Sequence, residues 1–190
     1  PVNALEPYKK REKKSILYTG SLRRQFGVLN LLRAMELISD EGIKLWICGA
    51  GDAEEEIRKA SKRDSRIKFY GLLDTQQARE LQKKASVLIN PRTSEGEYTK
   101  YSFPSKTMEY LLFGGSVIIN RLPGIPEEYY NYVFTPKDQS ISSLAECISH
   151  VINMEEDIRD EKSSEARRFI IANKNSVSQT KRILELIETY

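Results

Sequence analysis

The strongest constraint on the fold is a repeated alternation between short apolar runs and longer segments of helical period. Residues 15–19, 43–48, 86–90 and 116–120 are nearly continuous in apolar character and have the length of buried strands. Between such runs, apolar side chains recur at helical spacing, as at Leu29, Leu32 and Met35. Strands separated by helices pair in parallel, because a parallel connection must cross over the sheet. The alternation therefore predicts an open, doubly wound α/β domain.

The rest of the chain fits the same pattern. Shorter strands are predicted at 67–70 and 132–134, and helices at 27–39, 53–62, 75–84, 104–113 and, as a short turn or helix, 125–130. After Ser140 the chain is predicted to be helical in three pieces, with breaks near 153–156 and 173–175. Asp52 and Asp74 are placed to cap the helices that follow them. Residues 91–103 have no clear period, which is typical of a functional loop.

Composition excludes several classes of protein. The 30 Lys and Arg against 27 Asp and Glu leave a net charge of +3, too mild and too evenly mixed for a nucleic-acid-binding surface. No apolar run approaches the ~18 residues of a membrane span. Cys48 and Cys147 lie far apart in apolar segments, so we expect buried free thiols. A single histidine, His150, argues against a His-based zinc site and a Ser-His-Asp triad.

Small and polar residues collect where the predicted strands end. Gly20-Ser21, Gly49-Ala50-Gly51-Asp52, Gly71-Leu72 and Pro104-Ser105-Lys106 all stand at strand-to-helix junctions. Glycine permits close approach of the backbone to a ligand, and the N–H groups of a first helical turn attract anions. Each junction alone is also what tight turns in any α/β protein require. Together they predict a phosphate-bearing ligand at the carboxyl edge of the sheet.

Two common nucleotide-binding motifs are absent. The GAGD segment has Glu54 where a dinucleotide fingerprint needs its third glycine, and the phosphate loop G-x-x-x-x-G-K-[ST] does not occur. The segment 103–115, FPSKTMEYLLFGG, is more specific. Ser105 and Lys106 would stand in a first helical turn, where they can converge on a diphosphate. Glu109, one turn further on, can accept both hydroxyls of a ribose.

Five segments in this order resemble the donor-binding half of GT-B glycosyltransferases, specifically the large retaining group 1 (family 4). They are YTGSLRRQFGVLNLLRAM, LWICGAGDAEEEIRK, IKFYGLLDTQQARELQKKASVLINPR, FPSKTMEYLLFGGSVIIN and RLPGIPEEYY. The resemblance covers residues 15–151 and implies a Rossmann-like sheet with C-terminal helices. Within the family, the PSK…EY helix and the RLPGIPEEY segment resemble bacterial enzymes of capsule, exopolysaccharide or O-antigen assembly. The resemblance implies a linker at 1–14 from a missing N-terminal domain, a donor-binding domain at 15–172, and at 173–190 a helix that returns toward the missing domain.

The resemblance also implies a donor site. The residues it assigns there are Gly20, Ser21, Arg23, Arg24, Gly49, Tyr70, Gly71, Leu72, Glu95, Ser105, Lys106, Thr107 and Glu109. In these roles Glu109 binds the nucleotide ribose, Gly71 and Leu72 meet the nucleobase through their backbone, and Glu95 approaches the sugar. The catalytic residues stay unknown, with Glu95 and Lys106 as candidates.

The chain departs from the family pattern at one acidic position. Many members carry a second glutamate eight residues before the ribose glutamate, where this chain has Tyr101. Glu95 and Glu97 are the candidates for that role. Family members of this fold commonly work without a bound metal, and the chain has no Asp-x-Asp motif. We therefore expect no metal and no cofactor.

A second departure concerns the cations of the first loop. Many members place Arg directly after the first-loop glycine and Lys six residues after that glycine, where this chain has Ser21 and Phe26. The positive charge for the diphosphate is then expected from Arg23 or Arg24 in the same loop, or from Lys106.

The function expected from these residues is the nucleotide-sugar-binding half of a retaining hexosyltransferase. Its donor would be a UDP- or GDP-linked sugar, and its acceptor a glycan or lipid-linked glycan of surface polysaccharide synthesis, bound by the missing domain. The fragment alone is expected to bind nucleotide weakly and to turn nothing over. We expect a cytoplasmic location at the inner face of the plasma membrane, with peripheral membrane contact by the full-length protein. The alternative is a non-catalytic nucleotide- or phosphate-binding α/β module.

Overall fold

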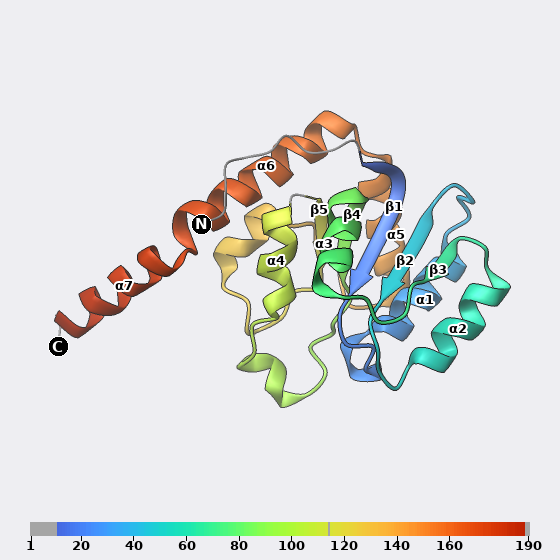
Figure 1. The fold of residues 1–190 in the computed structure, drawn as a ribbon, viewed down its shortest axis with the longest axis horizontal. Coiled ribbons are helices and arrows are strands. Elements are labelled where there is room, and N and C mark those ends of the chain that lie inside the picture. The colour runs from blue at the N-terminus through green and yellow to red at the C-terminus, as the bar shows by residue number, and fades with distance from the viewer. Residues whose placement is uncertain (1–10, 114, 189–190) are drawn as a thin grey trace.

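The computed structural model describes residues 11–113 and 115–188. Its centre is a five-stranded sheet in the order β3-β2-β1-β4-β5, with every neighbouring pair parallel (Figure 1). The strands are β1 (Glu12–Thr19), β2 (Lys44–Cys48), β3 (Ile67–Phe69), β4 (Ala85–Asn90) and β5 (Ser116–Ile119). The chain runs outward from β1 to β3 and then returns to place β4 on the other side of β1. This reversal confirms the predicted doubly wound α/β fold. It puts the topological switch point, the place where sheets of this kind generally bind ligands, between β1 and β4.

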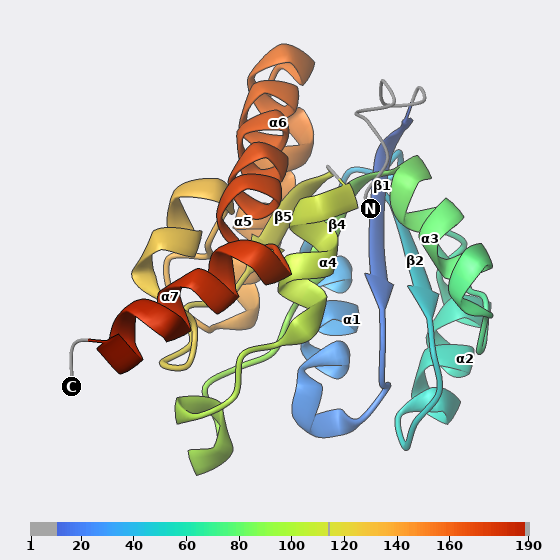
Figure 2. The ribbon, with the colours of Figure 1, turned by 60° about the vertical axis from the view of Figure 1, so that its left-hand side comes forward.

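Helices cover both faces of the sheet. They are α1 (Val28–Leu37), α2 (Glu54–Arg63), α3 (Thr75–Lys84), α4 (Ser105–Phe113), α5 (Ile141–Asn153), α6 (Glu156–Asn173) and α7 (Ser176–Glu188). Helices α1, α2 and α5 pack on one face, and α3, α4 and α6 on the other. Figures 1 and 2 show α7 projecting away from this layered body. The three predicted C-terminal helices are confirmed.

Successive side chains along each strand point to opposite faces of the sheet and pack into two separate hydrophobic cores. Ile16 and Tyr18 of β1 belong to the core on the α1 and α5 face, whereas Leu17 between them belongs to the core on the α4 and α6 face. On β2, Ile47 and Trp46 divide in the same way. A strand buried on both faces has no polar side to show in its sequence, and for this reason the strand runs are continuously apolar.

Two predicted boundaries change. β1 begins at Glu12, which pairs with Ala85, so residues 12–14 of the predicted linker belong to the sheet. Predicted linker residues 1–10 lie outside the described residues. The predicted strand at 132–134 is wrong. Tyr132 ends a 3-10 helix (η3, Glu127–Tyr132) and stacks on Phe169, and Phe134 makes an isolated bridge to β5.

One of the two predicted helix caps is confirmed. The Asp74 carboxylate accepts from the backbone N–H of Gln77 at 2.8 Å, and the Gln77 side chain accepts in return from the Asp74 backbone at 3.2 Å. The prediction for Asp52 is wrong, because α2 begins at Glu54 without a side-chain cap. Instead the Asp52 carboxylate accepts from the backbone N–H of Arg24 at 2.8 Å and so supports a short 3-10 turn, η1 (Arg24–Phe26).

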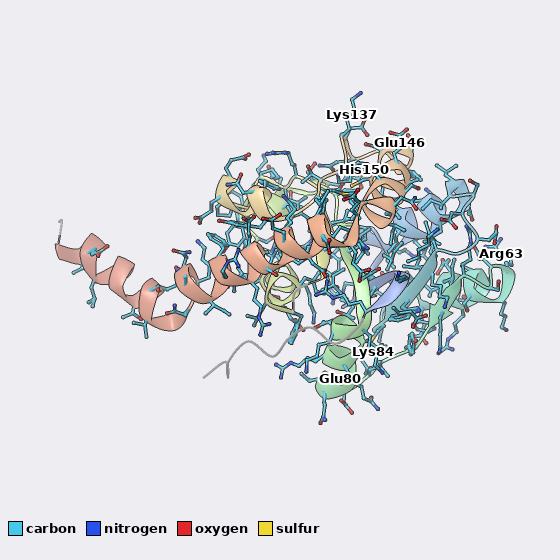
Figure 3. All side chains as sticks on the ribbon, turned by 90° about the horizontal axis from the view of Figure 1, so that it is seen from above. Arg63, Glu80, Lys84, Lys137, Glu146 and His150 are labelled. Carbon is cyan, nitrogen blue, oxygen red and sulfur yellow. The ribbon has the colours of Figure 1, made fainter. Side chains whose placement is uncertain are left out.

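The sequence also makes predictions about the cysteines, the metal-binding side chains and the helix lengths. Cys48 is buried and Cys147 half-buried, and both are free thiols. Within residues 11–113 and 115–188, no helix is long and apolar enough to cross a membrane. The same residues contain no group of three or more His, Cys, Asp or Glu side chains placed to hold a metal ion. His150 is exposed on the outer side of α5 (Figure 3).

Close backbone contacts build the carboxyl edge of the sheet. The Gly20 N–H donates to the Cys48 carbonyl at 3.0 Å, and the Gly49 N–H donates to the Gly71 carbonyl at 2.8 Å. A Cβ at Gly49 would lie 1.8 Å from the Gly20 carbonyl oxygen, and Gly49 has a φ of +146°. The loops after β1, β2 and β3 are therefore joined in series, and Gly49 is required by their packing.

Substituting Gly49 and Gly71 one at a time distinguishes the stability cost of a packing clash from the cost of backbone strain alone. Gly71 also has a positive φ, +67°, but a Cβ there would meet none of the described atoms within 4 Å. Gly71→Ala is therefore expected to cost about 1–2 kcal/mol of unfolding free energy through backbone strain alone. Gly49→Ala adds a backbone clash and is expected to cost about 3 kcal/mol or more. Urea denaturation of both variants measures this, and equal losses would contradict the packing role of Gly49.

Candidate functional site

A cavity of about 360 Å³ opens at the carboxyl ends of β1 and β4. It lies at the point where the strand order reverses, which is where open α/β sheets bind ligands. The residues that line it come from β1, the loop after β1, the end of β4 and the start of α4. They are Tyr18, Thr19, Gly20, Ser21, Phe26, Asn90, Arg92, Phe103, Pro104, Ser105 and Lys106.

The N-terminus of α4 opens onto this cavity. The helix begins at Ser105, one residue after the predicted start, and Pro104 precedes it. The Thr107 N–H donates to the Pro104 carbonyl at 2.8 Å, which closes the first turn. Ser105 is exposed and Lys106 half-buried. A helix start with an available hydroxyl and an ammonium group is suited to bind an anion.

Glu109 lies one turn further along α4, and both of its carboxylate oxygens are held. One oxygen accepts from Lys106 Nζ at 2.7 Å and the other from Gln82 Nε2 at 3.0 Å. Gln82 is fully buried and also donates to Thr19 Oγ1 at 2.9 Å. Sequence reasoning missed Gln82. Its signal was a polar side chain at a position where the helical period of α3 calls for an apolar one.

Tyr110 fastens α4 to the end of β1. Its hydroxyl accepts from the Thr19 backbone N–H at 2.9 Å and donates to the Thr19 carbonyl at 3.0 Å. The ring is fully buried, and burial raises the pKa of its hydroxyl well above the usual range for tyrosine. Tyr110 follows Glu109 directly in α4. Its contact with Thr19 therefore fixes the part of the helix that carries Lys106 and Glu109 to the strand whose end lines the cavity.

The predicted phosphate cations separate in space. Lys106 lines the cavity, but the guanidinium of Arg24 pairs with Glu56 in the groove between α1 and α2. Arg23 is exposed and lies outside the cavity lining. Arg92, which sequence reasoning missed, lines the cavity with its guanidinium 4.3 Å from the centre of the Phe26 ring. Its position directly after the Asn90-Pro91 end of β4 was the available signal.

The predicted nucleobase loop forms a separate open surface at the end of β3. A Cβ at Gly71 would have no described atom within 4 Å, and Leu72 is 78% exposed. Tyr70 is half-buried, with its ring 6.3 Å from that of Trp46 and the Lys68 ammonium 4.7 Å from its centre. The Gly49 N–H, which donates to the Gly71 carbonyl at 2.8 Å, links this loop to the loop after β2.

The other predicted site residues lie outside the cavity lining. Thr107 is fully buried in α4, and Gly49 serves the contact between loops. Glu95 and Glu97 are exposed in the loop 91–103, which contains a short 3-10 helix, η2 (Glu97–Lys100). Glu97 lies 3.8 Å from the Lys100 ammonium. The structure therefore brings Gly20, Ser21, Ser105 and Lys106 together and links Glu109 to them through Lys106.

The family follows from comparison with known sequences. The profile of the family described as Glycosyl transferases group 1 matches residues 13–154, most of the chain. The chain belongs to this family. None of the curated proteins compared with this group 1 glycosyltransferase chain matches it in sequence.

Solved structures share the fold of this group 1 domain at low sequence identity. S. aureus TarM has a TM-score of 0.76 at 16% identity, over 95% of this chain and 36% of TarM. Anabaena HepE in complex with UDP has a TM-score of 0.73 at 17% identity, over 94% of this chain and 49% of HepE. The catalytic domain of Helicobacter pylori cholesterol-α-glucosyltransferase has 0.68 at 15%, over 85% of this chain and 99% of that one. The chain thus spans about a third to half of the length of TarM and HepE.

Removing the Tyr110 hydroxyl tests the anchor between α4 and β1. Tyr110→Phe leaves the buried N–H and C=O of Thr19 without that partner, so we expect a loss of about 1–3 kcal/mol in unfolding free energy. Tyr101→Phe is the matched control, since the Tyr101 ring is 87% exposed and should leave stability unchanged. Chemical denaturation at pH 7 measures both variants. A Tyr110→Phe protein as stable as its parent would rule out the anchor.

The buried hydroxyls also predict a loss of stability in alkali. Burial raises the pKa of Tyr18 to about 12, against about 10 in an unfolded chain, and raises that of Tyr110 as well. The unfolded state therefore releases these protons first, so the stability they support is complete below pH 10 and falls as the pH rises toward 12. Denaturation midpoints between pH 9 and 11 should fall less steeply for Tyr110→Phe than for the parent. Parallel pH profiles would contradict this.

Proposed function

We propose that this domain binds the nucleotide-sugar donor of a retaining glycosyltransferase that transfers a hexosyl unit to a glycan or lipid-linked acceptor in surface polysaccharide synthesis. The observation that carries the proposal is the start of α4 at the switch-point cavity, with Glu109 held one turn further on. The proposal requires no metal ion, because side chains and backbone N–H groups would stabilise the negative charge of the phosphates.

The cavity offers what a departing diphosphate requires. When the bond between the sugar and the diphosphate breaks, negative charge develops on the phosphate oxygen. The first-turn N–H groups of α4, the Ser105 hydroxyl and the Lys106 ammonium are positioned to stabilise that charge, and the Gly20 loop lines the same cavity. These groups are held by the fold before the donor binds, so they need little rearrangement when charge develops.

Glu109 is proposed to hold the ribose. Its two carboxylate oxygens each accept one hydrogen bond within the protein, and each keeps a further lone pair for a ribose hydroxyl. Lys106 and Gln82 fix the plane of the carboxylate from both sides. Hydrogen bonds to a charged group contribute roughly 1.5–3 kcal/mol each, so Glu109 is expected to account for much of the nucleotide affinity.

Relatives of the same fold support a nucleoside diphosphate donor. TarM and HepE have been solved with UDP, HepE also with glucose, and TarM with α-GlcNAc-glycerol and fondaparinux. We propose a UDP- or GDP-linked donor here. Because the chain spans only a third to half of TarM and HepE, we assign the acceptor site to a further domain that faces the carboxyl edge.

The location belongs to the same proposal. Cys48 and Cys147 are free thiols, which fits a reducing compartment. We therefore place the enzyme in the cytoplasm, at the inner face of the plasma membrane where a lipid-linked acceptor would be met. In this arrangement residues 173–190 would return toward the acceptor domain. Helix α7 begins at Ser176 and projects from the body, and residues 189–190 lie outside the described residues (Figure 2).

Calorimetric titration with UDP, GDP, TDP and CMP tests the donor assignment. We expect weak binding of UDP or GDP, and at least tenfold weaker binding by Glu109→Ala, since a tenfold change corresponds to ~1.4 kcal/mol. Glu55→Ala is the matched control, because Glu55 is an exposed carboxylate on α2 paired with Lys59. A parent protein that binds none of the four nucleotides would refute the proposal.

Transfer itself is measured on the intact enzyme. Sugar transfer from the bound nucleotide to a lipid-linked or glycan acceptor supports the transferase assignment. Nucleotide binding without transfer to any such acceptor would instead favour the non-catalytic module.

A further inference from the structure

Arg92 is a cavity residue without a role in the function proposed above. It is half-buried and lines the same cavity as Ser105 and Lys106. Its guanidinium carbon lies 4.3 Å from the centre of the Phe26 ring, the distance of a cation–π contact. Phe26 also lines the cavity. An aromatic ring thus supports one face of a cationic group at the wall of a site suited to anions.

The backbone that carries Arg92 is fixed by tertiary contacts. Asn120 Nδ2 donates to the Arg92 carbonyl at 3.0 Å and to the Pro91 carbonyl at 3.2 Å. A Cβ on Gly27 would lie 2.2 Å from the Pro91 carbonyl oxygen, so the loop that carries Phe26 lies directly against Pro91. Phe26 and Arg92 are therefore brought together by the packing of the first loop against the end of β4.

The charge of Arg92 acts within the cavity. It lowers the pKa of the Tyr18 hydroxyl and opposes the larger effect of burial, which raises that pKa to about 12. Tyr18 lines the cavity and donates to the Ser21 carbonyl of the first loop at 2.7 Å. The guanidinium is therefore close to the loop proposed to face the phosphates.

A diphosphate needs more positive charge than the Lys106 ammonium and the Arg24 guanidinium can provide in the cavity. The Lys106 ammonium is shared with the Glu109 carboxylate at 2.7 Å, and the Arg24 guanidinium is paired with Glu56 away from the cavity. A nucleoside diphosphate carries more than one negative charge. A planar guanidinium suits it, because its parallel N–H donors bind two phosphate oxygens at once.

We propose that Arg92, supported by Phe26, binds the diphosphate of the donor and stabilises it as the leaving group. This inference rests on the proposed donor-binding function. As the bond from the anomeric carbon to the β-phosphate oxygen breaks, its electron pair stays on that oxygen. The anomeric carbon bonds to the oxygen of the acceptor hydroxyl, whose proton is taken up by the released diphosphate. The guanidinium stabilises the added charge without giving up a proton. Phe26 keeps the guanidinium plane in place and the cavity apolar beneath it.

The test compares ligands that differ in phosphate number. Calorimetry is done on the 190-residue chain with the nucleoside diphosphate that binds, with its monophosphate, and with inorganic pyrophosphate. Arg92→Ala is expected to weaken the diphosphate roughly tenfold to a hundredfold, to weaken the monophosphate distinctly less, and to remove pyrophosphate binding. Arg92→Lys should restore part of the loss, because it keeps the charge without the planar pair of donors.

Two further variants keep the test decisive. Arg33→Ala removes a positive charge from the exposed face of α1, so it should leave all three affinities unchanged. Phe26→Leu keeps an apolar side chain but removes the ring, and should weaken the diphosphate severalfold even if Arg92→Ala does not fold. Thermal unfolding midpoints establish that each variant is folded.

The outcomes separate this inference from the proposed function. If nucleotides bind and Arg92→Ala either changes no affinity or weakens the diphosphate and monophosphate by the same factor, the role of Arg92 is refuted and the proposed function stands. If pyrophosphate binding depends on Arg92 but no nucleotide binds, the proposed function fails and the anion site at Arg92 stands.

Discussion

The Tyr110 hydroxyl satisfies both the N–H and the carbonyl of Thr19, the last residue of β1. These backbone groups lie in a buried environment, where an unpaired donor or acceptor costs about 1–3 kcal/mol. One neutral phenol therefore fixes the position of α4 along β1. The start of α4 and the carboxylate of Glu109 take their places from this contact, and so does the cavity between α4 and the first loop. Without it, the polar link between α4 and β1 would run only through the Gln82 side chain, which donates to both Glu109 and Thr19.

The glycines of the carboxyl edge serve two different purposes. Gly49 and Gly27 have no room for a side chain, because the Gly20 and Pro91 carbonyls occupy the space of a Cβ. Gly20 lines the cavity, and Gly71 faces open space. A sequence shows all four as loop glycines. In the structure the first pair brings the loops together, and the second pair leaves backbone accessible at the cavity and at the end of β3.

The regular elements were predictable because local patterns determine them. Apolar runs buried on both faces and helical periods identified all five strands of the sheet and the helices, and α3 was predicted with its observed bounds. The prediction failed at 132–134, where Tyr132 and its neighbours are apolar because they pack on α6. It failed at Asp52 too, because that carboxylate satisfies η1, a turn 28 residues earlier in the chain. Neither contact leaves a local signature.

The sequence by itself determined the fold class, the family, and the edge of the sheet where the cavity opens. Periodicity reports on neighbours a few residues apart, and the parallel crossovers follow from the alternation of strands and helices. Only the tertiary structure decided which side chains share the cavity. It paired Arg24 with Glu56 on the far side of the first loop, seated Arg92 on Phe26, and joined Thr19 to Tyr110 across 91 residues. Such partners are set by how distant loops pack against one another, and a charged residue in an aperiodic loop gives no sign of which partner it will meet.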